Sequence, residues 1–240
     1  MIALTVCAAG AWAGAPAEET NPLRILALGD SYTIGEGVEE VLRWPNQLAA
    51  RLQEITHDDA TDKPVEPKLS TQLEIEPPRI IARTGWTTAD LIGVLEAEEL
   101  SPPYDLVTLC IGVNDQYQGR RFGSFSDGFV NLLDRAIAYA GDRPSRVLVL
   151  TIPDYTVTPF ARAFGRTGDA GELERYNEFV RDRATERGVM LGDIVDISRE
   201  AADDSSLLAD DGLHPSGAMY GRWVEVALPA VIRALGQTSE

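Results

Sequence analysis

The sequence is short of the residues on which several kinds of enzyme chemistry depend. A structural zinc site usually takes four cysteine or histidine ligands in closely spaced pairs, and the few such residues among these 240 form no pairs. The two lysines lie in a polar, proline-rich stretch, which does not suit the buried lysine of a Schiff-base enzyme. The sequence therefore predicts neither a structural zinc site nor a Schiff-base enzyme. The scarce residues are His57, His214, Cys7, Cys110, Lys63 and Lys68.

Positive charge and long hydrophobic runs are scarce as well. The chain has 21 lysines and arginines against 38 aspartates and glutamates, a formal net charge of −17. Such a surface repels nucleic-acid phosphates and anionic lipids. No apolar run reaches the roughly 18 residues of a membrane span. We therefore expect no nucleic-acid partner and no integral membrane span. The protein is also expected to be a monomer.

The amino-terminal segment has the composition of a targeting sequence. Residues 2–13 are apolar and small, and Ala11-Trp12-Ala13 has the A-x-A form of a signal-peptidase site. We interpret residues 1–20 as a signal peptide or leader and residues 21–240 as a single domain. The protein is then expected to be exported, to the periplasm or the exterior. If the segment is not a signal, the expected location is the cytoplasm.

The rest of the chain alternates short apolar runs with helical patterns, which is typical of a parallel α/β sheet. Residues 56–78 are polar and proline-rich and are expected to form a loop. The predicted strands are residues 24–28, 79–82, 106–111, 147–152 and 190–196. The predicted helices are residues 45–55, 87–97 (capped by Thr87 or Thr88), 127–140, 171–187 and 216–235.

Four polar motifs fall at predicted strand ends or just before the last helix. Ligands of open parallel sheets bind at the carboxyl ends of the strands, so the motifs are expected at one rim. Each motif alone is a weak signal, and the four together are a strong one. They are Gly29-Asp30-Ser31-Tyr32, Thr84-Gly85-Trp86, Gly112-Val113-Asn114-Asp115 and Asp211-Gly212-Leu213-His214-Pro215.

With these four motifs in order, the sequence resembles the SGNH (GDSL) hydrolase family of bacterial serine esterases and lipases, from residue 24 to about residue 235. The resemblance implies that Ser31 is the nucleophile and that Gly85 and Asn114 complete an oxyanion hole with it. It also implies that Asp211 and His214 are the other members of a catalytic triad. The implied fold is a three-layer α/β/α sandwich with a central parallel five-stranded sheet, flavodoxin-like in arrangement.

Residue chemistry agrees with those assignments and leaves alternatives beside them. A serine needs a base near neutral pKa, and His214 is favoured over His57, which lies in a polar predicted loop. Asp211, three residues before His214, is favoured over Asp210 as the residue that orients the imidazole. Thr33 replaces the second glycine of the G-x-S-x-G elbow and disfavours the larger α/β-hydrolase fold.

A metal-dependent phosphatase built on Asp30 and Asp115 is a weaker alternative, because further carboxylates at strand ends are missing. Both aspartates are expected instead to brace their turns. Arg120 and Arg121 either meet an anionic group of the substrate or are ordinary solvated charges.

Three aromatic residues, Trp44, Trp86 and Tyr155, are candidates for contact with the substrate. Trp44 has an equally good alternative as a hydrophobic staple on the helix that follows it. A short acyl group is expected, because no long exposed apolar segment suggests a lid or a lipid-docking surface.

The resemblance and the residue chemistry together predict a serine hydrolase of carboxylic esters, acting through an acyl-enzyme on Ser31 with His214 as base and Asp211 as orienter, and requiring no metal or other cofactor. Acyl esters, lysophospholipids and acetylated sugars are all possible substrates. The alternative from another class is a non-catalytic glycan- or ligand-binding module that retains the fold.

Overall fold

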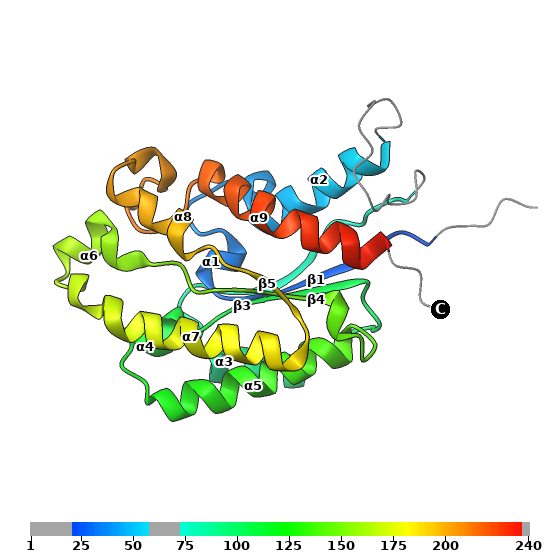
Figure 1. Ribbon diagram of the computed structural model, residues 1–240, viewed down its shortest axis with the longest axis horizontal. Helices are drawn as coiled ribbons and strands as arrows, with labels where there is room; N and C mark the ends of the chain where they lie inside the picture. Colours follow the sequence, from blue (N-terminus) through cyan, green and yellow to red (C-terminus); the bar gives the residue numbers. More distant parts are fainter. Residues whose placement is uncertain (1–20, 58–72, 237–240) are drawn as a thin grey trace, which may run out of the picture.

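The computed structural model describes residues 21–57 and 73–236, and its centre is a five-stranded sheet (Figure 1). All strands are parallel, in the order β2-β1-β3-β4-β5. The α/β class and the parallel five-stranded sheet predicted from the sequence are confirmed. The strands are β1 (Ile25–Gly29), β2 (Arg79–Ala82), β3 (Leu106–Cys110), β4 (Val147–Leu150) and β5 (Met190–Gly192).

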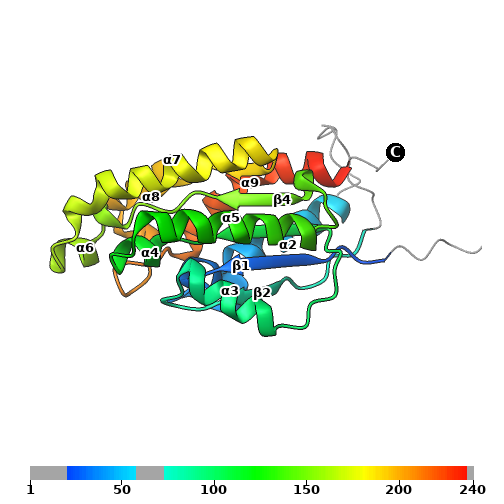
Figure 2. The ribbon, with the colours of Figure 1, turned by 90° about the horizontal axis from the view of Figure 1, so that it is seen from below.

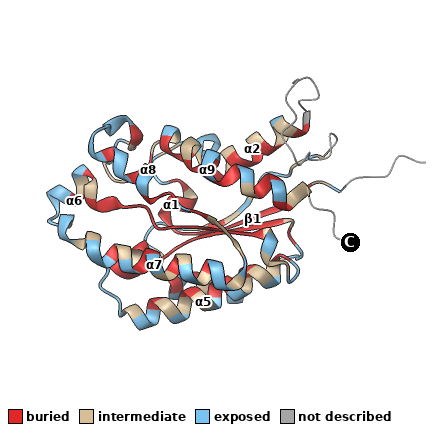
Figure 3. Cartoon of the chain, viewed as in Figure 1, coloured by how far each residue is buried: buried red, intermediate tan, exposed pale blue. Residues whose placement is uncertain are grey.

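The three central strands are buried along their whole length, because helices cover both faces of the sheet, and Thr108 of β3 is the one polar residue among them. Every residue of β1, β3 and β4 is buried, as expected of a parallel sheet with two covered faces. The edge strands are more exposed, with Arg79 of β2 facing solvent. Figure 3 shows this burial running along the sheet and the inward sides of the helices.

Two helical layers enclose the sheet, which completes the predicted three-layer sandwich. Helices α2 (Trp44–His57) and α9 (Gly217–Gly236) pack against each other on one face (Figure 1). Helices α3 (Thr88–Ala97), α5 (Phe122–Tyr139) and α7 (Ala170–Arg187) lie side by side on the other face (Figure 2). Aromatic contacts join that second layer, since the Phe125 ring stacks on the Tyr176 ring with centroids 4.3 Å apart.

The strand order fixes where a ligand can bind. The chain leaves β1, adds β2 on one side and then crosses to place β3 on the other, so the connections diverge between β1 and β3. In open α/β sheets this divergence opens a crevice at the carboxyl ends of the strands. Ser31 follows β1 and Asn114 follows β3, and both therefore lie beside that crevice.

Several predicted boundaries differ from the observed ones. Helix α5 begins at Phe122, five residues before its predicted start, because Gly123 and Gly128 weaken the helical pattern there. Strand β5 ends at Gly192 rather than at residue 196, and α8 (Val195–Arg199) follows it. His57 is the last residue of α2 and not part of a loop. The short helices α4 (Val113–Tyr117) and α6 (Pro159–Ala163) were not predicted, whereas α1 (Ser31–Ile34) agrees with the helix or turn expected to begin at Ser31.

Two predictions concern segments that are only partly described. The predicted leader, residues 1–20, lies outside the described residues, as does most of the predicted loop at residues 56–78. Within the described part of the chain, no helix is long and apolar enough to cross a membrane.

Strand β4 ends at Leu150, two residues before its predicted end, because a side chain replaces the sheet ladder there. The buried Asn177 of α7 accepts a hydrogen bond from the Ile152 amide at 2.7 Å and donates one to the Ile152 carbonyl at 2.9 Å. Both backbone groups of Ile152 are thus satisfied by one carboxamide.

We expect Asn177→Ala to lower the free energy of unfolding by about 2–4 kcal/mol, because each buried group left without a partner costs about 1–3 kcal/mol. Urea denaturation measures the change. Asn131→Ala, which removes an exposed carboxamide bonded to Arg135, is the matched control and should change stability by less than about 0.5 kcal/mol. Equal effects of the two substitutions would contradict the prediction.

Candidate active site

A cavity of about 130 Å³ lies at the carboxyl ends of the strands and collects residues from all four sequence motifs. Ser31, Gly85, Asn114 and His214 line it together, although they are separated by up to 183 positions along the chain. The remaining lining residues are largely apolar or aromatic. They are Tyr32, Thr84, Val113, Tyr117, Tyr155, Phe160 and Leu213.

Ser31 is the first residue of α1, directly after the end of β1. Asp30 caps this short helix, since its carboxylate accepts a hydrogen bond from the Tyr32 amide at 3.0 Å. The helix ends at Gly35 in the left-handed conformation, with the Gly35 amide donating to the Ser31 carbonyl. Both ends of the turn are therefore fixed, and Ser31 is held at the wall of the cavity.

His214 and Asp211 form a hydrogen-bonded pair in the loop before α9. Asp211 Oδ2 lies 2.6 Å from His214 Nδ1, and Asp211 Oδ1 accepts from the amides of Leu213 and His214, each at 2.9 Å. An ionised carboxylate can only accept, so Nδ1 carries the proton and Nε2 is left as an acceptor. The Tyr32 ring packs against the imidazole with centroids 5.6 Å apart.

The electrostatics of this pair keep Asp211 ionised. Partial burial raises the pKa of the Asp211 carboxyl, but hydrogen bonds from the His214 ring and from the His214 and Leu213 amides outweigh it, and the net pKa is lowered. The imidazole hydrogen bond goes to Asp211, and Asp210 beside it is exposed.

Gly85 lies on the loop that follows β2, and Asn114 lies on the short helix that follows β3. Gly85 has a φ of +86°, which a residue with a side chain rarely adopts, and a Cβ there would meet nothing within 4 Å. Asn114 belongs to α4, and its Nδ2 donates to the Trp86 carbonyl at 3.0 Å. A carboxamide nitrogen has two hydrogens, so the second one is free of this bond.

Asp30 and Asp115 are buried beside the site and bind backbone groups. Burial raises the pKa of Asp30 to about 7, the nearby Asp115 charge adds to this effect, and the amides of Tyr32 and Gly112 oppose it. Asp115 accepts from the Thr88 amide and hydroxyl, each at 2.8 Å, and so holds the start of α3. Burial raises the pKa of Asp115 too, against those hydrogen bonds.

In residues 21–57 and 73–236, no three or more histidine, cysteine, aspartate or glutamate side chains are grouped so that they could hold a metal ion. A two-carboxylate phosphatase site therefore has no further ligands among the described residues.

The three aromatic candidates have different positions. Tyr155 lines the cavity, and its hydroxyl lies 2.7 Å from Gln116 Oε1 and 2.8 Å from Asp169 Oδ2. Trp86 is half-buried against the core and contributes its carbonyl to Asn114. Trp44 is not brought to the cavity: its side chain is 1% exposed and packs in the core at the start of α2. The candidate contact between Trp44 and the substrate is thus corrected, because the indole is buried in the hydrophobic core and does not line the cavity.

Sequence reasoning missed Tyr117 and Phe160, which form an aromatic wall with Tyr155. The Tyr117 ring lies 5.9 Å from the Tyr155 ring and 6.3 Å from the Phe160 ring. Tyr117 could have been found, because it lies three residues after Asn114 on the same helical turn. Phe160 carried no comparable signal, since α6 reaches the cavity only through tertiary packing.

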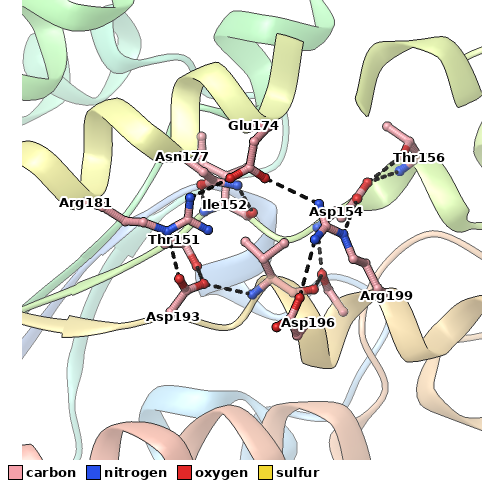
Figure 4. Close-up of polar contacts among 12 residues, drawn as sticks. Thr151, Ile152, Asp154, Thr156, Glu174, Asn177, Arg181, Asp193, Asp196 and Arg199 are labelled. Atoms are coloured by element: carbon pink, nitrogen blue, oxygen red, sulfur yellow. Dashed lines mark hydrogen bonds and ion pairs between the residues drawn. The ribbon is translucent and has the colours of Figure 1, made fainter. Parts of the chain in front are cut away.

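A polar network holds the segment that carries Tyr155 (Figure 4). The buried Asp154 accepts from Arg199 Nε at 2.9 Å and from the Thr156 amide at 3.0 Å. Arg199 also pairs with Glu174 of α7, at 3.3 Å. Since Asp154 directly precedes Tyr155, this network ties the aromatic wall to α7 and α8.

Comparison with known proteins agrees with this arrangement. A model of the GDSL-like lipase/acylhydrolase family matches residues 27–222. No curated protein matches the chain.

Solved structures of the same fold share little sequence with this chain. A member of the lipolytic protein G-D-S-L family from Veillonella parvula has a TM-score of 0.59 at 19% identity, covering 86% of this chain and 96% of its own. A lipase/acylhydrolase from Enterococcus faecalis has a TM-score of 0.59 at 19% identity, and the match covers 89% of this chain and 95% of that protein. An acetylxylan esterase from Geobacillus stearothermophilus has a TM-score of 0.57 at 18% identity, and the match covers 91% of this chain and 96% of that protein.

The raised pKa of Asp30 predicts how stability depends on pH. The folded protein holds this proton up to about pH 7, whereas the unfolded chain releases it near 3.8, the ordinary pKa of an aspartate side chain. Stability from this group is therefore present below about pH 4 and is lost as pH rises toward 7.

We expect Asp30→Asn to become more stable relative to the unmodified protein as pH rises through this window. The measured quantity is the free energy of unfolding of the variant minus that of the unmodified protein. The gain is at most about 1.4 kcal/mol per pH unit, and it levels off above about pH 7. Urea denaturation of both proteins at several pH values measures it. A stability difference that stays constant across the window would contradict the assignment.

Proposed function

The chain belongs to the GDSL-like lipase/acylhydrolase family, and from that membership we propose that it hydrolyses carboxylic esters through an acyl-enzyme formed on Ser31. The observation that carries the proposal is the 2.6 Å contact between Asp211 Oδ2 and His214 Nδ1, in a histidine that lines the same cavity as Ser31. It leaves His214 Nε2 able to accept the proton of a serine hydroxyl.

In the first half of the reaction, Ser31 Oγ attacks the carbonyl carbon of the ester, and His214 Nε2 takes the hydroxyl proton. The carbonyl oxygen of the ester becomes an oxyanion. The backbone amides of Ser31 and Gly85 and the Asn114 carboxamide stabilise its charge. The tetrahedral intermediate then collapses. The carbon–oxygen bond to the leaving group breaks, and His214 gives its proton to the departing alcohol.

In the second half, water attacks the acyl carbon and His214 accepts a proton from it. The bond to Ser31 Oγ breaks, the proton returns to Ser31, and the carboxylic acid leaves. Asp211 stays ionised throughout, in keeping with its lowered pKa, and stabilises the imidazolium that forms twice per cycle.

The cavity favours an ester with a small, apolar acyl group. Its volume of about 130 Å³ is close to that of an engineered protein cavity of about 150 Å³ that holds benzene. Val113, Tyr117, Phe160 and Leu213 present apolar surface to it. The acetylxylan esterase among the similar structures supports a small acyl group as well.

We expect Ser31→Ala and His214→Ala each to reduce kcat for p-nitrophenyl acetate roughly 10⁴–10⁶-fold. A fluorophosphonate probe should label Ser31 in the unmodified protein and not in Ser31→Ala. Activity that survives either substitution would overturn the catalytic assignment. A folded, unmodified protein with neither hydrolysis nor labelling would instead favour a non-catalytic ligand-binding module.

Asp211→Asn and Asp210→Asn form a matched pair. Loss of the Asp211 carboxylate should lower kcat by about 10⁴-fold, because the imidazole is no longer held in the required tautomer. Asp210→Asn should keep wild-type kcat. Comparable losses in the two variants would show that general negative charge near His214, and not the Asp211 hydrogen bond, supports catalysis.

Removal of the Phe160 ring should shift the acyl preference toward longer chains, because it opens the aromatic wall. Each added methylene that becomes buried is worth about 0.8 kcal/mol, or about fourfold in kcat/KM. The measurement compares p-nitrophenyl acetate, butyrate, hexanoate and octanoate. Phe164→Ala, which removes an exposed ring outside the cavity, should leave the order unchanged. An unchanged order in Phe160→Ala would exclude this wall as the acyl site.

A further inference from the structure

Two carboxamides of one short helix bind successive carbonyls of the loop that carries Gly85. Asn114 Nδ2 donates to the Trp86 carbonyl at 3.0 Å, and Gln118 Nε2 donates to the Gly85 carbonyl, also at 3.0 Å. The two residues are four positions apart, at the start and just past the end of α4, and therefore lie on one side of it. Asn114 has an assigned role at the cavity, whereas Gln118 has none and does not line it.

The loop itself has little else to hold it. Arg83, Thr84 and Gly85 are exposed, and Gly85 has the wide conformational freedom of a glycine. A turn bond from the Trp86 amide to the Arg83 carbonyl closes the loop, and the Thr84 hydroxyl donates to Glu36. The Gln118 side chain binds the Gly85 carbonyl directly and so restrains the peptide that follows Gly85. The Gly85 amide belongs to the preceding peptide, and this bond restrains that amide by holding the Gly85 residue in place.

Arg120 sets the orientation of the Gln118 carboxamide. Its Nη2 donates to Gln118 Oε1 at 3.2 Å, while its own amide donates to the Asp115 carbonyl at 2.8 Å. A guanidinium can only donate and a carbonyl can only accept, so the carboxamide satisfies both neighbours in one orientation: oxygen toward Arg120, nitrogen toward Gly85. A chain of donors thus runs from Arg120 through Gln118 to the Gly85 carbonyl.

We propose that Gln118, oriented by Arg120, is a positioning residue for the oxyanion site. It holds the Gly85 amide within hydrogen-bond distance of the ester carbonyl oxygen, which becomes charged in the reaction. This role rests on the proposed ester hydrolysis. Oxyanion donors act only within about 2.7–3.1 Å of the charged oxygen, and a displacement of about 1 Å can cost about 100-fold in rate. An exposed glycine loop needs such an external restraint.

The test compares Gln118→Ala and Gln118→Glu with the unmodified protein. Gln118→Ala removes the donor and should lower kcat for p-nitrophenyl acetate by about 10- to 100-fold with little change in KM, because the oxyanion exists only after attack begins. The rate of fluorophosphonate labelling of Ser31 should fall in parallel. The pH dependence of kcat/KM should stay that of the unmodified protein, since the His214–Asp211 pair is untouched.

Gln118→Glu tests whether the hydrogen bond that Gln118 donates, and not the space that its side chain fills, is what matters. It keeps the size of the side chain and its contact with Arg120, but at neutral pH it presents an acceptor to the Gly85 carbonyl. The loss in kcat should therefore be at least as large as in Gln118→Ala. A merely space-filling role would leave Gln118→Glu near wild type, and that result would overturn the proposal.

The matched control is Gln53→Ala, a glutamine of α2 that donates to the Leu73 carbonyl at 3.2 Å and accepts from the Ile75 amide at 2.9 Å, beside the opposite end of β1. It should keep wild-type kcat. Full activity in Gln118→Ala, or a rise in KM alone, overturns the positioning role while Ser31→Ala still abolishes hydrolysis. An unmodified protein that is neither active nor labelled instead overturns the ester hydrolysis, and the role of Gln118 with it.

Discussion

The parallel direction of all five strands is the constraint on which the rest of the molecule depends. Strands that run the same way all end at the same edge, so every loop that leaves a strand end begins at one rim. Burial of both faces of β1, β3 and β4 makes this direction hard to change, since almost every side chain of these strands is apolar. The divergence of the chain between β1 and β3 then opens the crevice that Ser31 and Asn114 border.

The loops at this rim are held mainly by single side chains that bind backbone groups. Asp30 binds the turn of Ser31, Asp115 binds the start of α3, and Asn177 binds both polar groups of Ile152. Two of these groups are carboxyls that burial makes costly to ionise, as the raised pKa values of Asp30 and Asp115 indicate. The structure thus keeps two carboxyl groups buried at the rim, where ionisation is unfavourable, and their hydrogen bonds give the loops a defined shape.

The residues recovered from the sequence are those whose chemistry is scarce or whose motif is local. His214 stood out because the chain has two histidines, and Asp211 because it lies three positions before His214. The sequence left Trp44 open between a pocket wall and a packing role, because an indole suits both equally well, and the structure places it in the core. Phe160 and Gln118 were missed because their roles depend on where α6 and α4 lie against other loops. The start of α5 was predicted five residues too late, because Gly123 and Gly128 have low helix propensity and tertiary contacts stabilise the helix there.

The sequence by itself determined the order of strands and helices, the parallel sheet and the four motifs, because hydrophobic periodicity and motif spacing are properties of neighbouring residues. It also determined which histidine is the candidate base. The tertiary structure decided which of the aromatic residues face the cavity, how large that cavity is, and how Gln118 and Arg120 reach the Gly85 loop. These features are contacts between segments far apart in the chain, and packing alone selects them.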